Sequence, residues 1–95
     1  MNDFDNPTKY TELSDEEKVS LQSWINCNLA YRQTINKTLD SYFLKDLYQK
    51  STGHYVTNGQ FKGAMLEAGF KVLDKNAQNW VFNVSKRSPA LKSVD

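Results

Sequence analysis

The stretch TNGQFKGAMLEAGF, Thr57 to Phe70, holds three of the chain's four glycines, although its apolar spacing is that of a helix. Its apolar residues recur at intervals of three and four and so share one helical face; they are Phe61, Ala64, Met65 and Ala68. Gly59 and Gly63 in the body of this helix indicate that its backbone comes very close to another group. The spacing leaves two candidates for that group, a neighbouring helix or a nucleic-acid backbone.

A phosphate-binding loop does not fit these glycines. A Walker loop needs four residues between its glycines followed by Lys-Ser or Lys-Thr, whereas three residues separate Gly59 from Gly63 and Ala64 follows. A dinucleotide fingerprint needs a strand before its glycines within a longer βαβ unit, and no such unit fits here.

Capping signals predict two helices before this stretch. Ser14 and Glu17 form a capping box for a helix that runs to about residue 36. A second helix spans about Leu39 to Lys50, with Thr38 or Asp40 as its N-cap and Gly53 just past its end. The buried stripe of the first helix is expected to consist of Leu21, Trp24, Ile25, Leu29 and Ile35.

A third helix and a β-hairpin are expected to follow. Thr57 and Gln60 make a second capping box, and Gly69 closes the helix that they open. Beyond it, Phe70–Leu73 reads as one strand, and Asn79–Ser85 alternates apolar and polar residues as a second strand does. The sequence therefore predicts an α+β, mostly α, winged helix-turn-helix: three helices followed by a β-hairpin wing.

Three segments are expected: a flexible acidic arm over residues 1–12, the winged helix over 13–87 and a disordered tail over 88–95. Residues 1–17 hold six acids and one base, a net charge of −5, and residues 18–95 hold eleven bases and five acids, a net charge of +6. A basic body behind an acidic leader is compatible with a polyanionic partner.

The compartment expected from the sequence is the cytoplasm. No apolar run approaches the length of a membrane span, and the chain starts with no export signal. The single cysteine, Cys27, excludes an internal disulfide and is predicted to be a small buried hydrophobe in a reducing environment. We expect no membrane partner, and the oligomeric state stays open.

The chain is not expected to be an enzyme. His54 is the only histidine and has no cysteine or acid cluster at metal-ligand spacing, so no metal is predicted. Nothing resembles a nucleophile elbow, and no cofactor is expected.

Single-stranded DNA is the expected partner, because lysines that follow a backbone alternate with aromatic rings on which bases stack. Arginine, the usual reader of guanine, occurs only twice, which disfavours sequence-specific contacts. Phe61, Phe70 and Phe82 are expected in the core, whereas Tyr55 and Trp80 fit the core and a binding surface equally well. The predicted DNA-binding residues are Lys45, Lys50, Tyr55, Asn58, Gln60, Lys62, Lys71, Lys75, Trp80, Lys86 and Arg87.

The run SYFLKDLYQKSTGHYVTNGQFKGAMLEAGFKV, residues 41–72, and NWVFNVSK, residues 79–86, together resemble a known family. It comprises small proteins of Gram-positive phages and mobile elements, and more narrowly the small winged-helix single-stranded-DNA-binding proteins of staphylococcal cassette chromosome elements. The resemblance covers about residues 35–87, and F-K-G-A-M with Asn79-Trp80 is its most specific part. Phe43 departs from the glycine expected in many relatives.

The resemblance implies a winged helix that binds single-stranded DNA during replication or transfer of a mobile element, with replication proteins of that element as further partners. Two other functions stay open: a regulator that binds duplex DNA, and an adaptor or inhibitor that binds a host or replication protein.

Overall fold

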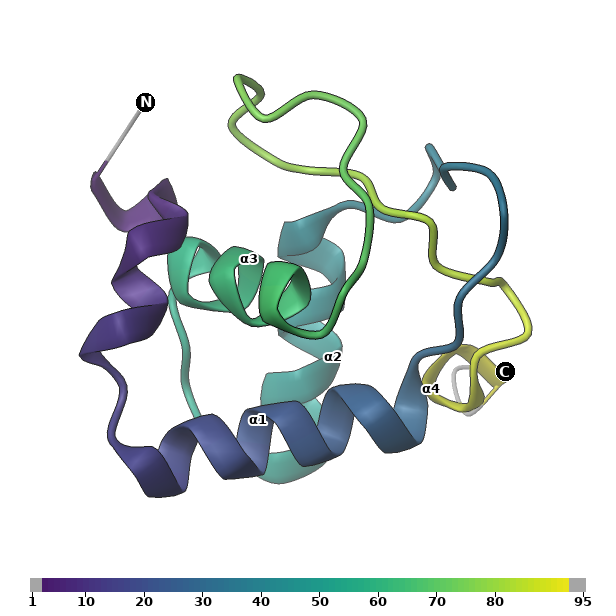
Figure 1. Ribbon diagram of the computed structural model, residues 1–95. Coiled ribbons are helices and arrows are strands. Elements are labelled where there is room, and N and C mark those ends of the chain that lie inside the picture. The colour runs from purple at the N-terminus through teal and green to yellow at the C-terminus, as the bar shows by residue number, and fades with distance from the viewer. Residues whose placement is uncertain (1–2, 93–95) are drawn as a thin grey trace.

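A computed structural model describes residues 3–92 of the chain. Two short 3-10 helices come first, η1 (Asp3–Asp5) and η2 (Pro7–Glu12). The helices α1 (Asp15–Asn28), α2 (Ser41–Thr52) and α3 (Asn58–Glu67) follow, and a single turn, α4 (Pro89–Lys92), lies near the C-terminus. Figure 1 places α3 at the centre, with α1 below it, the N-terminal segment beside it and the loop after α3 above it.

The helix starts follow the predicted capping. The side chain of Ser14 accepts a hydrogen bond from the Glu17 N–H, and the Glu17 carboxylate accepts one from the Ser14 N–H, so the capping box of α1 is complete. Asp40 is the N-cap of α2, and Thr57 with Gln60 forms the second capping box, at α3. These polar side chains satisfy backbone donors that would otherwise lack partners at each helix start.

The C-terminal ends of α2 and α1 do not depend on side-chain caps. Gly53 follows α2 in the left-handed region with φ 75°, which confirms its predicted role at the end of that helix. By contrast, α1 ends at Asn28 rather than near residue 36, because residues 30–36 form an irregular loop, with bends at Gln33 and Thr34, that hydrogen-bonds to residues 82–85. Leu29 is still buried, as predicted.

Seven of the ten residues of α3 are buried, including Gly59 and Gly63. Such a helix is enclosed on nearly every side and is the centre of the core. In the predicted winged helix-turn-helix this third helix would be exposed to DNA, so the burial of α3 contradicts that prediction.

The close neighbour that the glycines of α3 require is the N-terminal segment. A Cβ atom on Gly59 would lie closer than 3.0 Å to three backbone atoms of Asn6, and one on Gly63 would overlap Tyr10 and the Pro7 carbonyl. Of the two candidates offered by the sequence, the close neighbour is therefore a helix and not a nucleic-acid backbone. It is the 3-10 helix η2 with its N-cap Asn6, rather than the first long helix α1.

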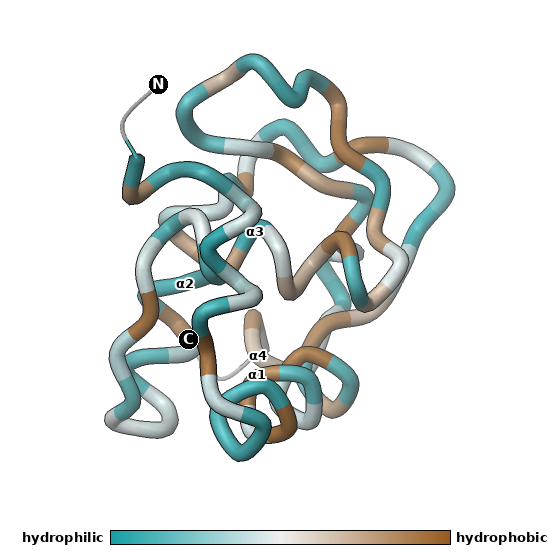
Figure 2. The backbone as a smooth tube through the Cα atoms, turned by 60° about the vertical axis from the view of Figure 1, so that its left-hand side comes forward, coloured by the Kyte–Doolittle hydropathy of each residue, from teal (hydrophilic) through white to brown (hydrophobic). Residues whose placement is uncertain are grey.

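Residues 3–12 are thus two 3-10 helices packed on α3 rather than a flexible arm. Figure 2 shows that this segment is mostly hydrophilic. Hydrophobic burial alone does not hold it in place, and contact between backbones, which glycine permits, provides part of the attachment.

The predicted β-hairpin wing is absent: residues 3–92 form no β-strand or sheet and show only isolated bridges. One antiparallel bridge, Val72 with Phe82, lies where the hairpin was expected. The inward positions of the predicted alternation are nevertheless buried, since Trp80, Phe82 and Val84 are each at most 1% exposed. The alternate positions are not exposed, because Asn83 is buried as well and Val81 and Ser85 are half-buried. The fold is therefore a mostly helical domain with an extended segment, not a winged helix-turn-helix.

The extended segment 80–85 lies between two loops instead of in a hairpin. On one side, the Arg32 N–H donates to the Asn83 carbonyl and the Asn36 N–H to the Phe82 carbonyl, at 3.0 and 2.8 Å. On the other side, the Leu73 N–H donates to the Val81 carbonyl at 3.2 Å. A few separate bonds to each neighbour take the place of a continuous ladder.

The start of the predicted disordered tail is ordered. Ser88 is buried, and its hydroxyl accepts a hydrogen bond from the Ala30 N–H at 2.8 Å and donates one to the Ser85 carbonyl at 2.6 Å. Ala90 in α4 joins the core. Residues 93–95 of that predicted tail lie outside the described residues.

Candidate nucleic-acid interface

Two loops gather most of the exposed positive charge. The loop 29–40 joins α1 to α2, the loop 68–88 follows α3, and backbone hydrogen bonds hold them side by side. Together they contain six bases and two acids, a net charge of +4. We call the six bases the basic loop face: Arg32, Lys37, Lys71, Lys75, Lys86 and Arg87.

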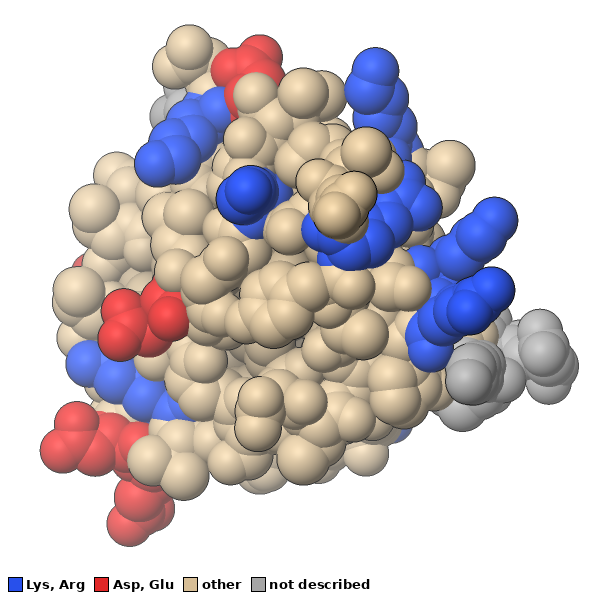
Figure 3. Space-filling view, turned by 45° about the vertical axis from the view of Figure 1, so that its right-hand side comes forward, with Lys and Arg blue, Asp and Glu red and all other residues tan. Residues whose placement is uncertain are grey.

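Most members of the basic loop face project freely into solvent. Lys71, Lys75, Lys86 and Arg87, all predicted as DNA-binding residues, are exposed. Arg32 is only half-exposed, because its guanidinium donates to the carbonyls of Thr34 and Ile35 and stabilises its own loop. Figure 3 shows Lys and Arg side chains mainly over the upper and right-hand parts of that view.

The opposite charge gathers on the N-terminal elements. Residues 3–28, which form η1, η2 and α1, hold six acids and two bases, a net charge of −4. We call them the acidic layer. In Figure 3 the Asp and Glu side chains lie mainly toward the left and lower left. The charge asymmetry seen along the sequence therefore becomes an asymmetry between two sides of the fold.

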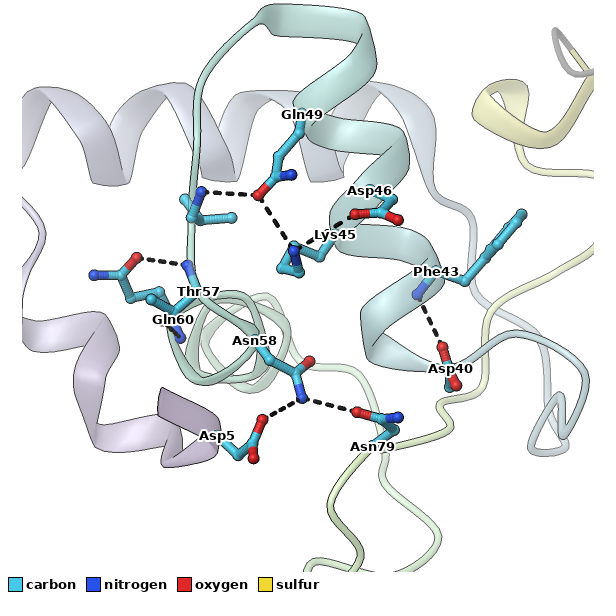
Figure 4. A network of polar contacts seen from close by, with 11 residues as sticks. Asp5, Asp40, Phe43, Lys45, Asp46, Gln49, Thr57, Asn58, Gln60 and Asn79 are labelled. Atoms are coloured by element: carbon cyan, nitrogen blue, oxygen red, sulfur yellow. Dashed lines mark hydrogen bonds and ion pairs between the residues drawn. The ribbon is translucent and has the colours of Figure 1, made fainter. Parts of the chain in front are cut away.

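Three of the predicted DNA-binding residues lie together, but beneath the N-terminal segment. Lys62 is 0% exposed, and its ammonium donates to the Asp5 carbonyl at 3.0 Å and lies 4.8 Å from the centre of the Trp80 ring. The Asn58 amide donates to the Asp5 carboxylate at 2.9 Å and to Asn79 at 3.0 Å, as Figure 4 shows. Lys62, Trp80 and Asn58 are enclosed and do not belong to a surface.

Burial disfavours the charged form of Lys62 and lowers the pKa of its ammonium below the ordinary 10.5, while the nearby Asp5 carboxylate partly offsets this shift. Asp5 is itself buried. A buried ammonium needs such a partner, because an isolated charge in the interior is costly. The N-terminal segment thus compensates a charge within the core.

Lys45 is a second predicted lysine that lies inside. It is 5% exposed; its ammonium lies 4.4 Å from the centre of the Tyr42 ring and 5.7 Å from that of Tyr55, and it donates to the Gln49 side chain at 3.3 Å. Tyr55 is 71% exposed, so of its two possible locations it takes the surface. The cation therefore lies within cation–π range of two exposed rings.

The remaining predicted residues are divided between structure and surface. Gln60 serves the capping box of α3, where its side chain accepts from the Thr57 N–H at 2.9 Å. Lys50 is exposed in the last turn of α2, at the end of that helix away from the basic loop face.

Cys27 was predicted to be a small buried hydrophobe, but its side chain is exposed on α1.

Sequence reasoning missed the most exposed ring on the loops. Tyr31 lies near the start of the loop 29–40, is 57% exposed and precedes Arg32 directly. The sequence analysis placed Tyr31 inside the first helix, which was predicted to run to about residue 36, whereas α1 ends at Asn28. The adjacent pair Tyr31-Arg32, an aromatic next to a cation, was the signal that could have revealed it.

Every helix among residues 3–92 is too short or too polar to span a lipid bilayer. No protein-family profile, curated protein or solved structure matches the chain.

Proposed function

We propose that this protein binds single-stranded DNA without sequence specificity, and that the basic loop face contacts the phosphates. The observation that carries the proposal is the concentration of six bases against two acids on two hydrogen-bonded loops. Phosphate contacts of this kind supply affinity that does not depend on sequence.

Two features favour a single strand over a duplex. The helix α3 is enclosed by its neighbours and offers no free face to a major groove. The loops instead combine flexible lysines with an exposed ring, the combination that single-strand binders use. Only two arginines occur, which argues against base-specific reading of a duplex.

The biological setting in this proposal comes from the family resemblance. It is replication or transfer of a mobile element in the cytoplasm, with replication proteins of that element as partners and no catalytic step. Because the wing is absent among residues 3–92, the resemblance adds no support from the fold. The proposal rests on the charge and exposure of the loops.

Fluorescence anisotropy with labelled oligonucleotides of unrelated sequence tests the proposal. We expect the chain to bind single strands more tightly than the matching duplexes. The double variant Lys71→Ala/Lys86→Ala should bind single strands about ten-fold or more weakly, because two phosphate contacts are lost. Lys50→Ala, which removes an exposed lysine outside the basic loop face, should bind as the wild type does.

Tighter binding to duplex, or an equal loss in Lys50→Ala and in the double variant, would overturn the proposal. Circular dichroism melting of each variant ensures that any loss of affinity comes from the surface and not from unfolding. All three lysines are exposed, so folding should be little affected.

A further inference from the structure

A surface hollow of about 310 Å³ lies beside Tyr31, between α1 and the end of α3. Its walls are the apolar side chains of Ile25, Leu29 and Phe70 and the polar side chains of Gln22, Ser23 and Asn26. A hollow of this size is at the lower limit of the roughly 300–1,000 Å³ typical of ligand sites. Apolar walls with a few polar groups are also typical of such sites.

The ring of Tyr31 is held rigidly at the edge of this hollow. One face stacks on Phe70, with ring centres 4.3 Å apart and an angle of 23° between the planes. The hydroxyl donates to the Ala68 carbonyl just after α3. The neighbouring backbone is fixed as well, because Ser85 donates to the Ala30 carbonyl and Arg32 donates to Asn83.

This rigidity leaves a large aromatic surface open to solvent. Tyr31 stays 57% exposed although its ring and hydroxyl are both fixed. A ring fixed before binding loses little conformational entropy when a flat ligand stacks on it. The arrangement therefore suits a planar aromatic partner.

The polar wall of the hollow offers hydrogen bonds to such a partner. Asn26 and Ser23 make no side-chain hydrogen bond within residues 3–92, and both lie on α1 facing the hollow. A hydroxyl and an amide both donate and accept, as the edges of nucleobases do. By contrast, the Gln22 amide nitrogen is already used, since it donates to Tyr10 and to the Ala64 carbonyl.

Charge beside the hollow favours a ligand that carries phosphate. Arg32 follows Tyr31 in the chain and Lys71 follows Phe70, so each ring of the stacked pair precedes a member of the basic loop face. None of the residues that line the hollow is charged.

From these observations we infer that the hollow beside Tyr31 binds one nucleobase of the single strand, stacked on the Tyr31 ring with its edge toward Ser23 and Asn26. This inference rests on the proposed function and adds a base-binding position to it. The adjacent cations hold the phosphates on either side of that base.

The test compares an oligothymidine of about a dozen nucleotides, within the range that one small domain covers, with an abasic strand of equal length. We expect Tyr31→Leu to weaken binding of the oligothymidine about five- to hundred-fold, which corresponds to the stacking energy of one base. Its affinity for the abasic strand should not change, because that strand offers only phosphates. Tyr31→Phe keeps the ring but loses the hydroxyl bond to the Ala68 carbonyl, so its affinity for the oligothymidine should fall much less than that of Tyr31→Leu.

A second variant keeps the test decisive if Tyr31→Leu does not fold. Asn26→Leu fills the hollow from an exposed position and should weaken binding of the oligothymidine at least five-fold. Cys27→Leu adds a leucine at the next exposed position, outside the hollow, and should have no effect.

Equal weakening of both strands by Tyr31→Leu, or wild-type binding by Asn26→Leu, would overturn the base site. In either case, loss of binding in Lys71→Ala/Lys86→Ala would leave the proposed function intact. If the wild type binds neither strand, the proposed function fails, and the base site fails with it.

Discussion

At the scale of single residues, the features that indicated a ligand serve contacts within the chain. Gly59 and Gly63 allow close approach, and the approaching group is the backbone of residues 6–10. The Lys62 ammonium donates to the Asp5 carbonyl and lies near the buried Asp5 carboxylate. The partner in this hydrogen bond is 57 residues away, a separation that local patterns do not reveal.

We predict that Gly59→Ala destabilises the protein by about 1–3 kcal/mol, because the added methyl group overlaps backbone atoms of Asn6 that cannot rotate away. In an exposed helix the same change would stabilise by up to about 1 kcal/mol. Urea unfolding measures the difference, and Glu67→Ala, at an exposed position of α3, is the control. A Gly59→Ala variant more stable than the wild type would contradict the packing.

We also predict that Lys62→Met lowers the free energy of unfolding by about 1–3 kcal/mol. The buried Asp5 carbonyl loses its donor, and the Asp5 carboxylate loses its compensating charge. Lys50→Met, at an exposed position, should change it by less than about 0.5 kcal/mol. Equal effects in these two variants, measured by urea unfolding, would show that Lys62 is not buried in a polar contact.

The depressed pKa of Lys62 adds a dependence on pH. Since the folded state holds this proton less tightly than the unfolded state, stability should rise as pH increases through the folded pKa toward 10.5. The difference between wild type and Lys62→Met isolates this effect from the tyrosines. A difference that is constant across this range would contradict it.

At the scale of elements, the capping box of α1 should make stability depend on acid pH. Hydrogen bonds from Ser14, first from its backbone N–H, lower the pKa of Glu17 below the ordinary 4.5. The stabilisation is therefore complete above 4.5 and is lost as pH falls through the folded pKa. Glu17→Gln can still accept from the Ser14 N–H without titrating.

The measurement is thermal unfolding of both proteins from neutral pH to below 4.5. Wild type should lose stability more steeply in the acid range than Glu17→Gln does. Parallel curves would mean that the carboxylate contributes nothing to the cap.

The helix starts were predictable because a cap is a local interaction, three residues wide at Ser14, Asp40 and Thr57. The hairpin was not, although the alternation of Trp80, Phe82 and Val84 gave their burial correctly. A period of two shows which side chains face inward, but it does not identify the backbone that supplies the hydrogen bonds. Here that backbone belongs largely to residues 30–41, which were expected to be mostly helical.

The candidate site was also predictable only in part: the sequence indicated which bases are exposed in loops, but not which residues the N-terminal segment covers. The exposure of Lys71, Lys75, Lys86 and Arg87 was predictable, because bases in loops are usually exposed. The burial of Lys62 was not predicted, because it involves Asp5 of η1, a segment too polar to be expected in a packed structure. For Trp80 the sequence left the core and a surface equally open, and the structure places it in the core.

At the scale of the whole molecule, the fold separates an acidic layer from the basic loop face. Charges of opposite sign on two sides of a small domain orient it toward a polyanion before contact. In the proposed function, the acidic layer would repel the strand and the basic loop face would hold it. Salt weakens the direct lysine–phosphate contacts and the repulsion between the acidic layer and the strand in different ways. A salt series therefore measures the two contributions separately.

We predict that Asp15→Asn/Glu16→Gln, in the exposed first turn of α1, raises the affinity for single strands only at low salt. Repulsion across the domain is screened once the Debye length falls to about 8 Å near 0.15 M salt, so this gain should disappear there.

Lys71→Ala/Lys86→Ala should instead reduce affinity at every salt concentration used. It should also flatten the slope of log affinity against log salt by about 1.4, since each phosphate contact on a single strand contributes about 0.7. Anisotropy titrations across a salt series measure both effects, and melting curves check that each variant is folded. If the acidic variant changed the slope as the lysine variant does, the strand would lie against α1, and the separation of the two charged sides would not determine where DNA binds.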